Sequence, residues 1–77
     1  IRVNAVAPGP VETPMARAMH DAAARKQWTD HVPQGRYADP SETAEAVLFL
    51  ASKAASAITG EILHVDGGFC AGGLLGR

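Results

Sequence analysis

A chain of 77 residues has room for one small domain at most, and a fold of that size buries only a marginal hydrophobic core. Its 47% hydrophobic and 19% charged residues are typical of a globular protein and not of a disordered one. The net charge of −1 and the dispersed basic residues indicate neither a nucleic-acid partner nor binding to an anionic membrane. The longest apolar run, residues 46–51, is too short to span a bilayer.

The single cysteine and the three histidines carry little chemistry in this pattern. Cys70 cannot form an internal disulfide, so we expect a free thiol and a cytoplasmic location. His20, His31 and His64 do not share the spacing of metal ligands, and we therefore predict no metal site. His20 precedes Asp21 in an alanine-rich segment, which favours a solvated helix face over an acid–base pair.

The first predicted element is a strand over residues 1–7, buried on both faces. These residues are largely apolar or β-branched, with Asn4 as the polar interior group. The run Pro8-Gly9-Pro10 ends the strand, because proline cannot donate a backbone hydrogen bond to a sheet. A start at Ile1, directly in strand-like sequence, predicts that the chain is a segment of a larger domain.

A helix is predicted next, beginning at Thr13-Pro14. Threonine is a good N-cap, and proline at the first helical position loses no hydrogen bond. We expect this helix to extend to about Trp28, followed by an irregular connection over residues 29–38. Its predicted apolar face consists of Met15, Ala18, Met19, Ala22 and Ala23.

The second helix has the clearest start. Asp39-Pro40-Ser41-Glu42 has the layout of a capping box, which predicts a helix over residues 40–53. Its apolar side chains are Ala44, Val47, Leu48, Phe49, Leu50 and Ala51. A turn at Thr59-Gly60 then leads to a final strand, Glu61 to Val65, which Gly67-Gly68 ends. We expect the tail, residues 69–77, to be loose or docked on a neighbour.

The order strand–helix–helix–strand predicts a right-handed crossover between two parallel strands. Two parallel strands do not make a stable sheet alone, so we expect the free edge of the first strand to meet something outside this sequence. Residues 1–77 are therefore predicted to be a single partial α/β domain. Because ligands of open α/β sheets lie beyond the carboxyl ends of the strands, the loop Pro8–Thr13 is the best candidate binding site. A purely structural turn is the alternative for this loop.

Three motifs give the chain a resemblance to a known family. Asn4-Ala-Val-Ala-Pro-Gly-Pro-Val-Glu-Thr13, Val32-Pro-Gln-Gly-Arg-Tyr-Ala-Asp-Pro-Ser-Glu42, and Thr59-Gly60 with Val65-Asp-Gly-Gly68 occur in this order. Together, over roughly residues 1–68, they resemble the last third of a short-chain dehydrogenase/reductase. The resemblance implies the C-terminal part of a Rossmann-type, doubly wound parallel sheet that is incomplete on its own.

The same resemblance implies a role for the loop after the first strand. In the family, the turn matching Pro8, Gly9 and Pro10 passes the nicotinamide end of NAD or NADP. The residue at the place of Val11 offers backbone groups to the carboxamide, and the residue at the place of Thr13 adds a hydroxyl. The choice between NAD and NADP lies outside this part of the family's sequence, and binding by this chain alone is not expected.

The resemblance also implies that residues 14–38 form a lid over the substrate. Met15, Met19 and Trp28 are the candidates to face a substrate. Ordinary packing against the sheet or a neighbouring helix is the favoured alternative for each of them.

The chain departs from the family at the catalytic residues. The family uses a tyrosine four residues before a lysine, whereas the only tyrosine here is Tyr37 and Ser41 stands four residues later. The family's glycine-rich phosphate turn is also missing. We therefore predict no catalytic residue in this chain, and a C-terminal fragment of an NAD(P)(H)-dependent short-chain dehydrogenase/reductase that is inactive alone.

Two alternatives to an inactive fragment assign the chain a role in binding other chains. One is a self-associating structural module without catalytic role, forming a homo-oligomer through the 40–53 helix and the 61–66 strand. The other is one half of a split enzyme, whose missing N-terminal half supplies the remaining strands and the Tyr/Lys pair.

Overall fold

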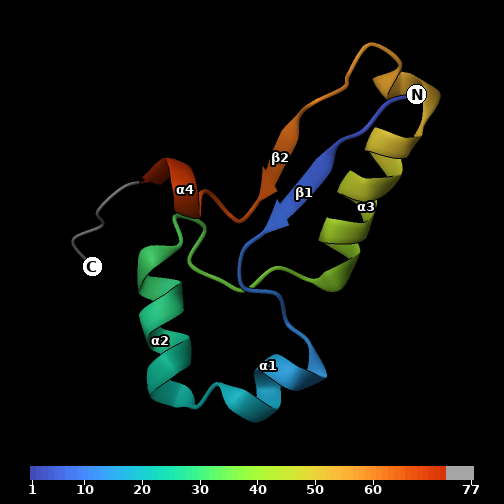
Figure 1. Ribbon diagram of the computed structural model, residues 1–77. Helices are drawn as coiled ribbons and strands as arrows, with labels where there is room; N and C mark the ends of the chain where they lie inside the picture. Colours follow the sequence, from blue (N-terminus) through green and yellow to red (C-terminus); the bar gives the residue numbers. More distant parts are fainter. Residues whose placement is uncertain (73–77) are drawn as a thin grey trace.

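The computed structural model describes residues 1–72, which form one layer of two strands with helices around it (Figure 1). In chain order the elements are β1 (Ala5–Pro8), α1 (Pro14–Met19), α2 (Ala22–His31), α3 (Pro40–Ala51), the 3-10 helix η1 (Lys53–Ala55), β2 (Ile62–Val65) and α4 (Phe69–Gly72). Both strands point toward α1 and α2, while α3 runs alongside β1 (Figure 1). No helix within residues 1–72 is long and apolar enough to cross a bilayer.

The two strands pair in parallel, as the strand–helix–helix–strand order predicts. Ala5 lies opposite Ile62, and Pro8 lies opposite Val65. The hydrogen bonds continue beyond the strand ends, because the Gly60 N–H donates to the carbonyl of Val3 at 2.8 Å. The prediction of an α/β arrangement is thus confirmed for the part of the chain that the structure describes.

The first strand differs from the sequence prediction in its bounds and its burial. It spans Ala5–Pro8 and not residues 1–7, and its two end residues are exposed while its two middle residues are half-buried. The prediction of a strand buried on both faces is therefore wrong for this chain by itself. The physical reason is that, within residues 1–72, β1 has a strand partner on one edge only and helix α3 as its main cover.

The predicted helix from Pro14 to about Trp28 is in fact two helices. The predicted N-cap is confirmed, since the Thr13 hydroxyl oxygen accepts from the Ala16 N–H at 3.1 Å. The first helix ends at Met19, and Asp21 begins a second one by accepting from the Ala24 N–H at 2.8 Å. Aspartate is among the strongest N-caps, and here it interrupts the alanine-rich run. The predicted common face of Met15, Ala18, Met19, Ala22 and Ala23 therefore does not exist.

The helix predicted from its capping box is confirmed at its start. The Asp39 N–H donates to the Glu42 carboxylate at 2.8 Å, which is the reciprocal bond of the box. The helix ends at Ala51 rather than at residue 53, because Ser52 turns the chain out of the helix with its N–H bonded to the Phe49 carbonyl. Lys53 then begins η1.

The hydrophobic core of the described residues is small. It consists of Val32, Tyr37, Leu50 and Ala55. The radius of gyration is 14.2 Å, whereas a compact domain of this length has a radius of about 11 Å. The tail prediction is corrected for residues 69–72, which form α4; residues 73–77 lie outside the described residues.

Candidate functional site

The loop of residues 8–13 leaves β1 at the carboxyl edge of the sheet and lies directly against the turn that follows β2. The Gly9 N–H donates to the Val65 carbonyl at 3.2 Å, which extends the strand pairing by one residue. A Cβ at Gly9 would lie 2.9 Å from the Cα and the Cβ of Asp66. Only glycine lets the two chain segments approach this closely, which explains the Pro-Gly turn in physical terms.

The middle of the loop is fixed by a parallel bridge between Val11 and Ala38. The Glu12 N–H donates to the Ala38 carbonyl at 2.8 Å, and the Ala38 N–H donates to the Pro10 carbonyl at 2.9 Å. In a parallel bridge of this kind the N–H and C=O of the central residue point away from the partner. Val11 accordingly has no hydrogen-bond partner for either group within residues 1–72.

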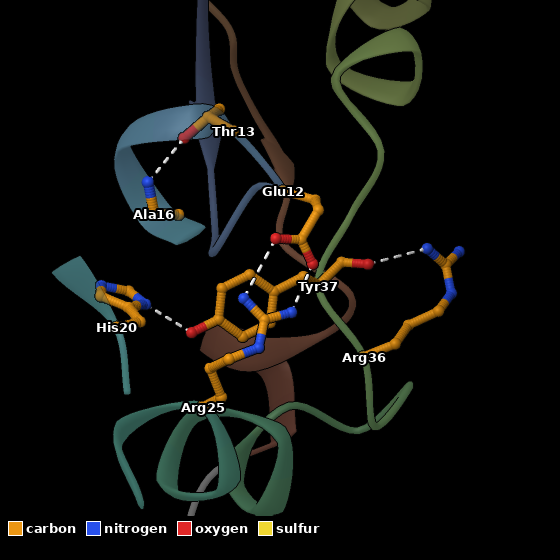
Figure 2. A network of polar contacts seen from close by, with 7 residues as sticks. All are labelled: Glu12, Thr13, Ala16, His20, Arg25, Arg36 and Tyr37. Atoms are coloured by element: carbon orange, nitrogen blue, oxygen red, sulfur yellow. Dashed lines mark hydrogen bonds and ion pairs between the residues drawn. The ribbon is translucent and has the colours of Figure 1, made fainter. Parts of the chain in front are cut away.

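The end of the loop is the N-cap of α1. The Thr13 hydroxyl oxygen accepts from the Ala16 N–H, as Figure 2 shows. A hydroxyl that accepts in this way still has its own proton to donate. The loop therefore presents one backbone donor, one backbone acceptor and one hydroxyl donor from Val11 and Thr13.

A network of side chains holds the loop to helix α2 and to residues 36 and 37 (Figure 2). Arg25 on α2 donates both terminal nitrogens to the carboxylate of Glu12, at 3.0 Å for the Nη1–Oε1 pair. The same guanidinium lies 4.3 Å from the centroid of the Tyr37 ring. The Tyr37 hydroxyl lies 2.5 Å from Nδ1 of His20. The hydrogen bond with the Arg25 guanidinium lowers the pKa of Glu12. The loop therefore carries an ionised carboxylate whose negative charge is balanced by Arg25.

A second pair of charges lies where the irregular segment meets α3. Arg36 donates to both carboxylate oxygens of Glu42, at 2.8 and 2.9 Å, and also to the Tyr37 carbonyl. The Arg36 guanidinium, together with the Asp39 N–H, lowers the pKa of Glu42 to about 2. This pair anchors residues 36 and 37 to the start of α3.

The turn after β2 is organised by Asp66. Its carboxylate accepts from the N–H groups of Gly68 at 3.0 Å and Cys70 at 3.1 Å, and these bonds lower the pKa of Asp66. The hydrogen bond with Asp66 raises the pKa of the exposed Cys70 thiol. An open cavity of about 480 Å³ adjoins this turn, lined by Gln34, Ala38, Glu42, His64, Val65, Asp66, Gly67, Gly68, Cys70 and Ala71. Two carboxylates at this cavity already have partners, since Asp66 accepts from backbone N–H groups and Glu42 is paired with Arg36.

The predicted lid residues are not gathered around the loop. Met15 and Met19 are exposed on α1, with 69% and 74% of their surface accessible. Trp28 on α2 packs instead against Phe69 of α4, with ring centroids 5.6 Å apart. Their roles toward a substrate remain predictions.

Four residues of the site were missed or misread from the sequence: Glu12, His20, Arg25 and Tyr37. His20 was expected on a solvated face, but its ring contacts the buried Tyr37. Glu12 and Arg25 are 13 positions apart, across a loop, a helix and a helix break, so no helical or strand periodicity relates them. Among residues 1–72 there is no cluster of three His, Cys, Asp or Glu side chains that could hold a metal ion.

Comparisons with known proteins identify the family. A family model described as enoyl-(acyl carrier protein) reductase, of the short-chain dehydrogenase/reductase family, matches residues 1–70. The chain is 53% identical over 70 residues to galactitol 2-dehydrogenase (L-tagatose-forming) of Cereibacter sphaeroides, covering 90% of this chain and 28% of that enzyme. It is 53% identical over 68 residues to 3-oxoacyl-[acyl-carrier-protein] reductase of Vibrio harveyi, covering 88% and 28%.

Solved structures show the same fold. The crystal structure of a putative 2-deoxy-D-gluconate 3-dehydrogenase from Agrobacterium tumefaciens with bound NADP superposes with a TM-score of 0.87 at 44% identity, covering 91% of this chain and 29% of that one. A gluconate 5-dehydrogenase from Burkholderia cenocepacia in complex with NADP and tartrate gives 0.81 at 38% identity, covering 90% and 28%. The chain thus spans less than a third of each of these relatives. Because the family model and these relatives match along nearly all of its described length, the chain belongs to the short-chain dehydrogenase/reductase family.

Proposed function

We propose that this chain is the C-terminal segment of an NAD(P)(H)-dependent short-chain dehydrogenase/reductase, in which the loop of residues 8–13 holds the nicotinamide end of the cofactor. The observation that carries the proposal is the unpaired N–H and C=O of Val11 on a loop fixed from behind by Ala38. Two structural relatives at 44% and 38% identity hold NADP. The family match establishes membership without placing the segment in the enzyme, so the placement rests on the order of the three motifs.

The chemistry of the loop fits a nicotinamide. A primary carboxamide has one acceptor oxygen and an NH₂ donor, and Val11 offers the complementary donor and acceptor. The Thr13 hydroxyl proton is a further donor at the same edge. When bound, the nicotinamide would supply or accept the hydride of a carbonyl–alcohol conversion. This chain's part is to orient the ring, because its loop is fixed by two backbone hydrogen bonds to Ala38 before any ligand arrives.

Orienting the nicotinamide ring is the only role proposed for this chain, and we propose that the chain alone is inactive. Proton transfer in the family requires a tyrosine followed four residues later by a lysine, and the sequence has no such pair. Tyr37 does not substitute for it, since its side chain is buried and its hydroxyl is bonded to His20. Purified residues 1–77 should show no NADPH oxidation with any carbonyl substrate above the rate without protein. NADPH oxidation that co-purifies with the chain, and not with a contaminating enzyme, would overturn the proposal that the chain alone is inactive.

The cofactor contact is tested in the longer enzyme that the proposal implies. Val11→Pro removes the N–H, whereas the control Val11→Ala keeps it. We expect Val11→Pro to weaken NADPH binding about tenfold, the worth of one hydrogen bond to a fixed ligand. Val11→Ala should bind NADPH within about twofold of the parent.

Adenosine diphosphate ribose, which lacks the nicotinamide, separates this contact from damage to the loop. Both variants should bind it as the parent does. The proposal fails if Val11→Pro and Val11→Ala weaken NADPH binding equally. It also fails if the loss for Val11→Pro is as large with adenosine diphosphate ribose.

A second candidate function is self-association through residues 40–53 and 61–66, and the exposure of apolar side chains favours it. Val47, Leu48 and Phe49 on α3 are 51%, 64% and 43% exposed, and Ile62 on β2 is 58% exposed. Burying large apolar side chains stabilises by about 1.5–3 kcal/mol each when burial is complete. A partner surface at this face would therefore have a strong driving force.

Native mass spectrometry tests the second candidate. The parent should give multiples of 8.0 kDa, and Leu48→Lys should shift it toward the monomer. Met19→Lys is the matched control, because Met19 is at least as exposed as Leu48 but lies outside the proposed interface. A monomeric parent at micromolar concentration would contradict self-association.

The same spectrum examines the split-enzyme alternative. A heavier companion chain should then be present, and mixing with it should restore both cofactor binding and turnover. The flat shape and the small core of residues 1–72 favour completion by further strands of some kind.

A further inference from the structure

We propose that Arg25 is a positioning residue that locks the loop of residues 8–13 to helix α2, so that the loop and the lid helix move as one unit. The consequence for the cofactor rests on the function proposed above. The lock itself is a property of the fold and stands on contacts between four side chains, Glu12, His20, Arg25 and Tyr37 (Figure 2).

The first contact joins the loop to α2. Arg25 binds both carboxylate oxygens of Glu12, the paired geometry that is strongest for these groups. Their side chains are 35% and 30% exposed, so the pair is partly shielded from water and less screened than a free surface pair. Glu12 stands between Val11 and Thr13, the two residues of the loop that offer polar groups. A shift of Glu12 therefore moves both of them.

The second contact places Arg25 on a firm support. Its guanidinium lies 4.3 Å from the centroid of the Tyr37 ring, within the range of a favourable cation–π interaction. Tyr37 is 7% exposed and is held at its far end by His20, whose ring meets it edge-on at 75°. Arg25 thus has its charge paired on one side and its flat face covered on the other.

The third link closes the network through the backbone. Tyr37 is followed by Ala38, which forms the bridge to Val11. Besides the Gly9–Val65 hydrogen bond at its start, the loop is therefore tied to neighbouring segments by the backbone through Ala38 and by a side chain through Arg25. His20 is also the C-cap of α1, so the network reaches the end of that helix as well. If helix α2 moved without disturbing the loop, the Arg25–Glu12 ion pair and the Arg25–Tyr37 cation–π contact would have to break together.

Amide hydrogen exchange on the purified protein, without any nucleotide, tests this lock. The reporters are the N–H groups of Glu12 and Ala38, which both form the bridge. The reference is the Gly60 N–H, which pairs with Val3 far from the lock. Arg25→Gln should speed exchange at both reporters about fivefold, the effect of losing a partly exposed ion pair, while the Gly60 reference stays unchanged.

A neighbouring lysine is the matched control. Lys26 lies on the same helix and pairs with Asp30 one turn later, without contact to the loop. Lys26→Gln should leave the reporters unchanged. Arg25→Lys keeps the charge but loses the paired geometry, and it should restore part of the protection.

Two results would overturn the lock. The first is unchanged exchange at Glu12 and Ala38 in Arg25→Gln, and the second is an equal effect in Lys26→Gln. If Arg25→Gln accelerates Gly60 as much as the reporters, the effect is global, and the comparison of Arg25→Gln, Glu12→Gln and the double variant then decides the outcome. Coupled residues predict that the double variant exchanges no faster than the worse single one, and additive effects would contradict the proposal.

This outcome is independent of the proposed function. A failed Val11→Pro test would remove the cofactor role and leave the exchange result standing. A failed exchange test would remove the lock and leave the cofactor contact untouched.

Discussion

Two units of this molecule differ in the interactions that stabilise each of them internally. The sheet unit, defined as residues 1–8 and 39–65 with β1, α3, η1 and β2, is held mainly by backbone hydrogen bonds and by side chains bonded to backbone. Arg2 shows this well, because its guanidinium donates to the carbonyls of Leu50, Ser52 and Ile58 at 3.0 to 3.3 Å. The lid unit, defined as α1, α2, residues 32–38 and α4, is held mainly by side-chain pairs.

Burial, in contrast, is similar in the two units. Each unit contributes two core residues, Leu50 and Ala55 in the sheet unit and Val32 and Tyr37 in the lid unit. Each also leaves large apolar side chains in water, such as Leu48 and Ile62 in the sheet unit and Met15 and Met19 in the lid unit. Backbone pairing forms a strand pair with any partner at hand, but the apolar faces of a parallel pair need cover that two strands and one long helix do not provide. The comparison teaches that both units leave apolar side chains uncovered, and that the sheet unit differs in having a parallel strand pair whose faces need further cover.

The largest expected effect lies at the joint between the two units. Gly67 has φ of +64° and a Cβ there would lie 2.6 Å from Cγ1 of the buried Val32. Gly60, in the sheet unit, has a similar φ of +75° with nothing within 4 Å. Gly60→Ala should cost about 1 kcal/mol from left-handed backbone strain alone. Gly67→Ala should cost a further 1–3 kcal/mol, roughly, from overpacking.

Denaturant unfolding of both glycine variants provides the measurement. Because the backbone conformations are alike, the difference between them reports the contact with Val32. Equal destabilisation by the two substitutions would show that Gly67 and Val32 can move apart freely, and that the joint between the units is loose.

The next effect breaks the sheet unit only. Asn4 donates from Nδ2 to the Ile58 carbonyl at 3.0 Å and accepts from the Glu61 N–H at 3.0 Å. Asn4→Ala should lower the free energy of unfolding by about 1–2 kcal/mol, because one side chain makes both bonds. Hydrogen exchange should localise the damage, with the Gly60 N–H accelerated and the Ala38 N–H of the bridge to the lid unit unchanged. Equal acceleration at Gly60 and Ala38 would contradict the separation into two units.

The smallest effect concerns pH and the link between residue 36 and α3. The pKa of Glu42 is about 2 in the fold and has an ordinary value of 4.5. Between these values the unfolded chain binds more protons than the folded one, so stability falls as the pH is lowered through this window. The contribution is complete above about pH 4.5 and lost below about pH 2.

The Glu42 effect can be measured by following unfolding with circular dichroism between pH 6 and pH 2. The free energy of unfolding of the unsubstituted protein is compared with that of Glu42→Gln at each pH. The variant has no carboxylate at position 42 to protonate, so its free energy of unfolding should fall less steeply as the pH is lowered through this window. Glu12 and Asp66 also have lowered pKa values and act in the same direction, but they are present in both proteins and cancel in the difference. Parallel pH profiles for the parent and Glu42→Gln would show that the Arg36–Glu42 pair contributes nothing to stability.

Local signals in the sequence determined much of the fold. Thr13, Asp39 and Glu42 act over three residues or fewer through bonds between side chains and nearby backbone, and each starts its helix where the sequence predicts. The strand order follows from alternating element types in the same way. Asp21 shows the limit of such reading, because it is an equally local cap that the apolar periodicity concealed.

The sequence by itself determined the helix starts, the parallel strand pair, the loop at its carboxyl edge and the family to which the motifs point. Only the tertiary structure decided that Glu12 meets Arg25, that Tyr37 supports the guanidinium, and that Val11 turns its peptide groups outward. Caps and periodicities depend on neighbours within one turn of the chain. Contacts between a loop and a helix 13 residues later depend on how the chain bends between them, and that bend is fixed by packing rather than by local preference.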